Sequence, residues 1–550
     1  MRRNLTRICS LVTASAVILS LLAGCGKQGE KKETTDTGAA QEGNLLPVKS
    51  PVTLKYWAGN NVPTILANYS EIAMYKELEK RTGVKIEFIH PAAGQEKEVF
   101  NMMLASGDLP DLIENINASY SGGLSKAFAD GVIVDMKPLM DKYAPNITDL
   151  YKTYPELKMT VETLDGQYFV APWVKGSNAI RVQNGLIMRK DLLADVGKKV
   201  PTNVKEFEEV LQAFKDKGVK VPLSIDKKDI GKDIIGGMFG VYPYEGFMVE
   251  NGKVNYWASS PNFKEYVTTL ARWYEKGLID KEFSLNTSKV KEARITSGET
   301  GVFASTAGSG FLKYLEPGKK SNPKYDLIGV PFLNPKFTLV DDFSSTTAGA
   351  VSIFAANKNK NVTMAWIDYL YGKEGNLLAN FGTEGESYTM VNGVPTFTDL
   401  IVKNPEGKAM SDIGRKYARS FGSAAMVQDK RYGDQFWSLP QQIDALATWS
   451  KSVDETVKAA NKVYGELSPE ESQSIASKNN DITTYVDEMI LKFIMGVEPV
   501  SKLDEFQAQL KKMGIDEITK LHQNAHDKFL VKFPDAKNPR DIEISDYYIK

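Results

Sequence analysis

Cys25 is the residue whose position in this chain predicts the most definite chemistry. It follows a start that contains three arginines, the apolar run 11–22 and the small residues Ala23 and Gly24. Such a run is too short to span a bilayer. A basic N-terminus, a short apolar run and small residues before a cleavage site are typical of an export signal that is removed from the mature protein. We therefore predict that residues 1–24 are a signal peptide and that the mature chain begins at Cys25, outside the cytoplasm.

The four residues Leu22-Ala23-Gly24-Cys25 resemble the bacterial lipobox. In that motif the cysteine thiol receives a diacylglycerol, so the resemblance implies lipidation of Cys25 and an extracytoplasmic protein anchored to the cell membrane. The alternative is an ordinary secretory signal with an incidental cysteine. An ordinary signal, however, has no use for a cysteine directly after Leu-Ala-Gly.

The composition agrees with a soluble, exported domain that is tethered to the membrane by a lipid. The only other cysteine, Cys9, belongs to the predicted signal, so no thiol remains for a disulfide, a thiolate metal site or a nucleophile. With 42% hydrophobic residues in 550, the chain can bury a large core without disulfides. The balance of 68 basic and 69 acidic residues argues against a nucleic-acid partner.

Motifs for catalysis and metal binding are weak. The chain has no GxSxG, no GxGxxG after a strand and no GxxxxGK[ST], which leaves nucleophile, dinucleotide and phosphate-loop chemistry unsupported. His522 and His526 have a spacing that could share a zinc ion, but no third ligand is near, and we expect a solvated helix there. Asp226-Lys-Lys-Asp229 lacks the alternating ligands and turn glycine of a calcium loop. We predict no catalytic residue, no metal and no cofactor.

Hydrophobic periodicity predicts the elements that must position a binding site. Strand, helix, strand, helix, strand is the pattern of a parallel sheet, and a second strand and helix follow later in the chain. In the C-terminal stretch 440–526, hydrophobic residues recur at helical spacing almost throughout, with breaks near 468–469 and 496–499. The first group of expected elements is strand 52–57, helix 72–82, strand 84–89, helix 96–105 and strand 111–114, and the second is strand 185–189 and helix 203–217.

Five segments in order resemble the extracellular solute-binding proteins of family 1, the maltose-binding group, in its longer LipO-type lipoprotein branch. Met188-Arg189 replaces the Tyr-Asn usual in the family, and members of this branch carry an arginine there. The segments are Leu104-Ala-Ser-Gly-Asp-Leu-Pro-Asp111, Gly185 to Leu193, Val200 to Phe207, Phe381-Gly-Thr-Glu-Gly-Glu-Ser-Tyr388, and the ending from Phe493-Ile-Met-Gly496 to Met513-Gly-Ile-Asp516.

The resemblance implies an α/β, two-lobed periplasmic-binding-protein-like fold of type II, with a ligand cleft between the lobes and a helical C-terminal part. It implies capture of an oligosaccharide or sugar acid by lobe closure and delivery to the permease subunits of an ABC importer. We expect a monomer. The division that follows is a signal peptide at 1–24, a flexible linker at 25–46, an N-lobe of 47–178 and 335–390, and a C-lobe of 179–334 and 391–550.

Tryptophans are the natural candidates for a sugar site, because sugar rings have apolar faces that pack on flat aromatic side chains. Three of the seven lie within apolar helical stripes, which predicts a core role for Trp273, Trp366 and Trp449. Three others lie in loops or at strand ends, where α/β clefts bind ligands. We therefore expect ligand contacts from Trp57, Trp173 and Trp437, with packing as the alternative for each.

Four polar residues are candidates for hydrogen bonds to the sugar hydroxyls. Asn60 follows the first strand, Tyr120 opens a glycine-containing loop, Asp342 lies in a chain that crosses back to the N-lobe, and Glu386 belongs to one of the resembling segments. The alternatives are a helix cap for Asn60, a turn after Tyr120, a solvated acidic pair for Asp341 and Asp342, and a role in the fold for Glu386.

Two rival functions remain open at this level. Carboxylate pairs are abundant, so a secreted glycosidase, which needs only two acids near each other in space, is not excluded by motif counting. Peptide-binding receptors reach a similar length. Labelled oligosaccharides separate the three cases, since an enzyme shortens them, a sugar receptor binds them intact and a peptide receptor ignores them.

Overall fold

The structure is a computed structural model that describes residues 45–550, apart from 245, 338, 340, 405–409, 452, 455–457, 459–460, 538–541 and 550. The predicted signal peptide, Cys25 and nearly all of the predicted linker lie outside the described residues.

The first sheet is built on the predicted strand–helix alternation. Its order is β12-β3-β1-β2, with β1 parallel to β2 and β3, and β12 antiparallel to β3. Gly83 has a φ of 73° and ends α1 directly before β2, a backbone conformation that favours glycine. The predicted parallel pairing is confirmed. The strands are β1 (Val52–Trp57), β2 (Val84–Ile89), β3 (Leu112–Glu114) and β12 (Val351–Ile353).

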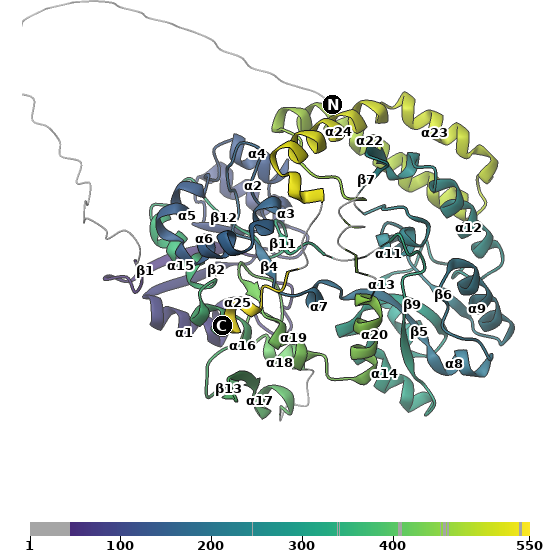
Figure 1. The fold of residues 1–550 in the computed structure, drawn as a ribbon, viewed down its shortest axis with the longest axis horizontal. Coiled ribbons are helices and arrows are strands. Elements are labelled where there is room, and N and C mark those ends of the chain that lie inside the picture. The colour runs from purple at the N-terminus through teal and green to yellow at the C-terminus, as the bar shows by residue number, and fades with distance from the viewer. Residues whose placement is uncertain are drawn as a thin grey trace, which may run out of the picture. The chain divides into compact units, whose positions relative to one another are not determined.

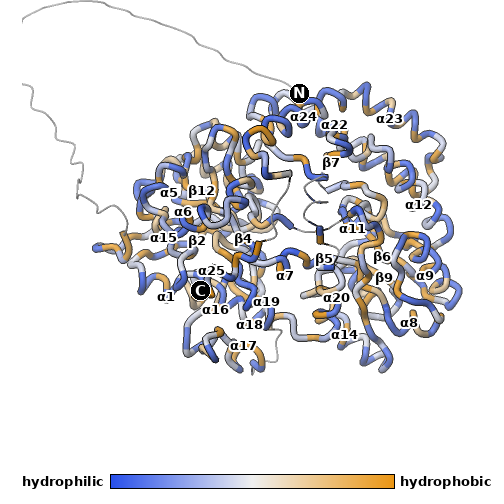
Figure 2. The backbone as a smooth tube through the Cα atoms, in the orientation of Figure 1, coloured by the Kyte–Doolittle hydropathy of each residue, from blue (hydrophilic) through white to orange (hydrophobic). Residues whose placement is uncertain are grey.

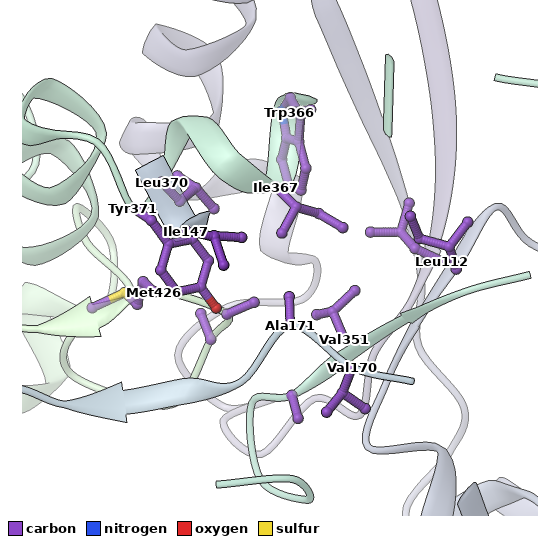
Figure 3. Packing of buried hydrophobic residues seen from close by; sticks show 14 of the residues in the cluster. Leu112, Ile147, Val170, Ala171, Val351, Trp366, Ile367, Leu370, Tyr371 and Met426 are labelled. Atoms are coloured by element: carbon purple, nitrogen blue, oxygen red, sulfur yellow. The ribbon is translucent and has the colours of Figure 1, made fainter. Parts of the chain in front are cut away.

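One hydrophobic core surrounds this sheet and joins segments that are far apart in sequence. Leu112, Ile147, Val351, Trp366 and Met426 are each at most 2% exposed and belong to one continuous cluster (Figure 3). Burying a side chain of this size stabilises the fold by about 1.5–3 kcal/mol. The same core includes residues 424–427 and 542, 544 and 548, which the sequence-based division had assigned to the C-lobe.

The second sheet has the order β10-β5-β9-β6, in which only the pair β6 and β9 is parallel. Helices cover both of its faces, with α8 and α9 on one side and α14 and α20 on the other (Figure 1). The buried hydrophobic residues of β6 and β9 are Val221, Leu223, Val302 and Phe303, whereas α9 alternates in hydropathy because only one face is buried (Figure 2). The strands are β5 (Asn184–Arg189), β6 (Val221–Ser224), β9 (Thr300–Thr306) and β10 (Leu327–Val330).

Three smaller pairings complete the sheets. Strand β4 (Trp173–Lys175) lies between β11 (Ser344–Ser345) and β15 (Val427–Gln428). Two hairpins pair β7 (Phe247–Glu250) with β8 (Lys253–Tyr256), and β13 (Tyr388–Val391) with β14 (Val394–Phe397).

The helices of the first half are α1 (Ala73–Thr82), α2 (Glu96–Ser106), α3 (Ile116–Ser119), α4 (Gly123–Ala129), α5 (Lys137–Tyr143), α6 (Pro145–Thr153), the 3-10 helix η2 (Pro155–Thr160), α7 (Asn178–Arg181), α8 (Lys190–Asp195), α9 (Val204–Asp216), α10 (Lys227–Ile230), α11 (Asp233–Gly236) and α12 (Phe263–Glu275). Those that follow are α13 (Ser288–Thr296), α14 (Ala307–Ser321), α15 (Lys360–Tyr369), α16 (Lys373–Phe381), α17 (Asp399–Val402), α18 (Met410–Gly414), α19 (Lys430–Phe436), α20 (Pro440–Ser450), α22 (Pro469–Ile494), α23 (Leu503–Lys512), α24 (Ile515–Lys532) and α25 (Asp546–Ile549).

The predicted helical stretch 440–526 is correct for most of its length, and the predicted break near 468–469 is confirmed, but the irregular segment begins earlier, at residue 462. Gly465 there has a φ of 82°, and Ser468 precedes a proline, which disfavours helical backbone. Ser468 then begins α22 with a capping box that includes Glu471. The irregular segment places its side chains at the candidate site.

Candidate ligand-binding site

A cavity of about 900 Å³ lies where distant parts of the chain meet. Its volume is in the upper part of the range of ~300 to 1,000 Å³ that is typical of small-molecule sites. The lining comes from α4, residues 159–170, residues 342–346 around β11, residues 462–471, and α24.

Helix α24 turns one face to this cavity. Ala525, Lys528, Phe529 and Lys532 all line it, and their spacing of three, four and seven residues puts them on one side of an α-helix. The chain from α4 and residues 159–170 forms the facing wall.

Aromatic side chains line the cavity from both walls. Phe128 and Phe169 stack with centroids 4.2 Å apart and an interplanar angle of 25°, and Tyr464 stacks on Phe529 at 5.2 Å and 10°. These rings offer flat apolar surfaces of the kind that sugar faces require.

Asp342 is held in an ionised state at the edge of the cavity. Its carboxylate pairs with Lys458 at 2.7 Å and with Lys462. Burial raises the pKa of Asp342, but the two ammonium groups lower it by more, so the pKa of this carboxyl lies well below its usual range. The charged oxygens can only accept hydrogen bonds.

Lys532 joins the two walls. Its Nζ donates to the carbonyls of Thr163 (2.6 Å) and Leu164 (3.0 Å) and pairs with Glu162 Oε1 at 2.9 Å. Burial raises the pKa of Glu162, but the hydrogen bonds from Lys532 and Tyr168 outweigh it, so the pKa lies below its usual value. Glu162 and Asp342 are therefore ionised and offer no proton to a reaction.

Neutral polar groups also line the cavity. They are Ser125, Thr160, Thr163, Gln167, Ser344, Thr346 and Ser468. The Oγ of Ser344 is buried and has no hydrogen-bond partner in the described part of the chain. Hydroxyl groups both donate and accept, which suits them to the hydroxyls of a sugar.

Trp57 and Trp437, two of the predicted platforms, are packed inside the protein. Trp57 is 1% exposed, donates its indole N–H to Ser119 Oγ at 3.0 Å and lies edge-on to Phe100. Trp437 is 6% exposed and packs in a different cluster beside Phe436. The structure does not bring these two rings together, and their contact with a ligand stays a prediction.

Trp173 lies one strand away from the cavity. It is half-buried on β4 and pairs with Ser345 of β11, whose neighbours Ser344 and Thr346 line the site. Its buried indole N–H lacks an acceptor among the described residues.

Of the seven sequence-predicted ligand residues, Asp342 is the one that lines the cavity. Asn60 holds its own loop, with Nδ2 donating to the carbonyl of Leu66 at 2.8 Å. Tyr120 donates its hydroxyl to Asp130, and Glu386 is exposed before β13. Ligand contact by these three residues stays a prediction.

Sequence reasoning missed the aromatic walls because phenylalanines and tyrosines in apolar stripes look like core residues. Phe128, Phe169 and Phe529 fit such stripes, and only the fold shows that they border a cavity. The break near Ser468 and Pro469 was predicted from the sequence, but Gly465, which directly follows Tyr464, was the available sign that the irregular segment begins earlier.

The predicted core tryptophans are confirmed, but the two histidines of α24 differ from expectation. Trp273, Trp366 and Trp449 are each at most 2% exposed. His522 stacks on Phe247 at 4.0 Å, and His526 is 5% exposed and accepts a hydrogen bond from the Tyr464 N–H, so the prediction of solvated histidines is wrong. Within the described ranges, no group of three or more His, Cys, Asp or Glu residues could hold a metal ion. No helix in that part of the chain is long and apolar enough to cross a membrane.

Known proteins resemble this chain along most of its length. Residues 64–377 match the family model described as bacterial extracellular solute-binding protein. The fructooligosaccharide ABC transporter substrate-binding protein FusA of Streptococcus pneumoniae is 25% identical over 544 residues, which cover 94% of this chain and 97% of FusA. Lipoprotein LipO of Bacillus subtilis is 25% identical over 70% of this chain and 74% of LipO. The crystal structure of the alginate-binding protein AlgQ2 without calcium ion superposes with a TM-score of 0.69 at 26% identity and covers 88% of this chain and 99% of AlgQ2.

Proposed function

Because this chain belongs to the family of bacterial extracellular solute-binding proteins, we propose that it is the oligosaccharide-binding component of an ABC importer. Its ligand occupies the cavity between α4 and α24. The family consists of binding proteins without catalytic activity, so the glycosidase alternative is set aside.

One observation carries the proposal, namely that stacked aromatic pairs line both walls of a cavity whose other lining groups are polar. Phe128 with Phe169 supports the apolar face of a sugar from one side, and Tyr464 with Phe529 does so from the other. The relatives agree on the ligand class, since FusA is named for fructooligosaccharide and AlgQ2 for alginate, both chains of sugars. A peptide receptor has no such support.

The remaining predictions from sequence complete the proposal. Cys25 carries the lipid that anchors the protein to the membrane, as the lipobox and the lipoprotein name of LipO support. Two lobes close over the ligand as rigid bodies, and the protein then delivers it to the permease subunits. Asp342 contacts the ligand at the edge of the cavity, and Trp173 supports that edge from the neighbouring strand β4.

A cavity-filling variant tests the site. Ser125 lines the cavity from α4, so Ser125→Trp should abolish binding, whereas Ser477→Trp on the exposed surface of α22 should not. Calorimetry with a panel of oligosaccharides of three to five sugars is the measurement, and a ligand at 100 times its Kd adds ~2.7 kcal/mol of stability in a thermal-shift screen. Binding that survives Ser125→Trp would place the site elsewhere, and intact binding of peptides but no oligosaccharide would refute the function.

A further inference from the structure

We propose that the ligand of this cavity is an uncharged oligosaccharide and that the charge of the cavity wall rejects oligomers of uronic acids. This inference rests on the proposed function and narrows its substrate class. The observations that carry it are the signs of the charges around the cavity and the partners that those charges already have.

Acidic groups outnumber basic groups on the lining. It contains five carboxylates against three ammonium groups. The carboxylates belong to Glu162, Asp165, Asp342, Glu466 and Glu471, and the ammonium groups to Lys462, Lys528 and Lys532.

Two of the three lysines of the lining already form ion pairs within the protein. Lys462 pairs with Asp342. Lys532 pairs with Glu162 at 2.9 Å and donates to two backbone carbonyls, which fills the three donor positions of an ammonium group. Lys528 is the one cavity lysine without an ion pair in the described part of the chain, and its side chain is exposed.

Three carboxylates, in contrast, have no cation within ion-pair distance among the residues that the structure describes. Glu466 accepts a hydrogen bond from Ser125 Oγ at 3.2 Å, and Glu471 accepts one from the Ser468 N–H at 2.9 Å. Asp165 is exposed. Their negative charge is therefore not neutralised by a nearby partner.

Three cations lie next to the cavity but outside its lining, and each is already bonded to Asp341 or Asp342. Lys175 pairs with Asp341, Arg181 Nε donates to the carbonyl of Asp341 at 2.8 Å, and Lys458 pairs with Asp342. All three lie outside the lining and are used within the protein.

A uronate oligomer carries one negative charge on each sugar and needs a cation, ideally arginine, for each of them. The lining has no arginine, and a ligand carboxylate there meets an excess of like charge. A neutral sugar needs only ring faces and groups that donate and accept hydrogen bonds, which the aromatic pairs and the hydroxyls of Ser125, Ser344 and Thr346 supply.

Calorimetry on the full mature chain at low salt tests the proposal. The probes are neutral fructan, glucan, mannan and galactan oligomers of three to five sugars, and galacturonate and alginate oligomers of the same lengths. Two unit charges of the same sign at ~4 Å in water repel enough to weaken binding roughly five-fold, so we expect every uronate oligomer to bind at least about ten-fold more weakly than the best neutral probe. A uronate that binds as tightly as the best neutral oligomer would overturn this inference and leave the proposed function intact, whereas the absence of binding by either class would overturn both.

A charge-removal variant gives a second readout. Asp165→Asn combined with Glu466→Gln should raise the ratio of uronate to neutral affinity roughly five-fold. The control, Asp481→Asn combined with Glu505→Gln, removes two exposed charges on α22 and α23 away from the lining and should leave that ratio unchanged. An unchanged ratio in the first variant would show that these carboxylates do not set the selectivity.

Discussion

Tyr464 lines the cavity while its hydroxyl is engaged elsewhere, with the carbonyl of Ala536 at 3.3 Å. The ring, and not the hydroxyl, is therefore the part that a sugar would meet. We expect Tyr464→Ala to weaken oligosaccharide binding about two- to ten-fold, because an aromatic contact contributes ~0.5–1.5 kcal/mol beyond its buried area, and Tyr464→Phe to retain most of the affinity. Calorimetry measures both, with circular dichroism as the folding control. Equal losses in the two variants would mean that the hydroxyl matters instead.

Trp173 and Trp437 differ in what a substitution should change, ligand binding for the first and stability for the second. Trp437 is buried, so Trp437→Ala should lower the free energy of unfolding by about 3–5 kcal/mol. Trp173 lies outside the cavity lining and pairs with β11, so Trp173→Ala should weaken ligand binding indirectly, through displacement of the lining residues Ser344 and Thr346. Urea unfolding and calorimetry on both variants are the measurements. If neither variant alters affinity, the tryptophan platforms predicted from sequence are wrong, although the cavity could still bind through its other rings.

His522 makes the stability of α24 dependent on pH. Burial against Phe247, opposed only in part by Glu471, lowers its pKa from 6.5 to about 4. The unfolded chain therefore binds the proton more readily, and the stability that is present above pH 6.5 is lost as the pH falls towards 4. Between pH 7.5 and 5, the wild type should lose about 1–2 kcal/mol more than His522→Gln in urea unfolding. Parallel losses in the two proteins would contradict this.

At the scale of elements, one lysine holds two short helices together. Lys291 of α13 pairs with Asp226 at 3.1 Å and with Asp229 at 2.5 Å, and both carboxylates are almost fully buried at α10. Lys291→Met would leave two buried charges with much less compensation, so we expect a loss of about 3–5 kcal/mol in the free energy of unfolding. Lys289→Met on the exposed side of the same helix is the control and should change stability by less than about 0.5 kcal/mol. Similar losses in both variants would disprove the role of the buried cluster.

The sequence was sufficient for the fold and insufficient for the site. Periodicity predicted β1, α1 and β2 because each has a buried and an exposed face, and it predicted the fully buried β3 from its apolar run. The superposition on AlgQ2 confirms the two-lobed periplasmic-binding-protein-like class. The cavity depends on which apolar stripes face each other across long sequence distances. Nothing near Phe128 in the sequence indicates that it lines the same cavity as Phe529, so pattern reasoning placed the aromatic site on tryptophans instead.

At the scale of the whole molecule, the lipid anchor proposed at Cys25 concerns where the protein is held and not how its body folds. Cys25 lies outside the described residues, and residues 26–44 separate it from the described body. Cys25→Ser should therefore give a folded protein with unchanged oligosaccharide affinity that no longer stays with washed membranes. Cell fractionation is the measurement, with binding of the released protein as the control. Retention of the variant in the membrane fraction would show that something other than this cysteine holds the protein there.

Under the proposed function, the lining of the cavity also determines how much of the chain must be exported before the protein can bind its ligand. Its facing walls come from α4 and α24, so residues from 124 to 532 must be present before the site exists. A chain that crosses the membrane from its N-terminus exposes the Phe128 wall long before Phe529 and Lys532 arrive. Under the proposed function, ligand therefore cannot assist the early steps of folding, and the chain binds no oligosaccharide until almost all of it has been exported.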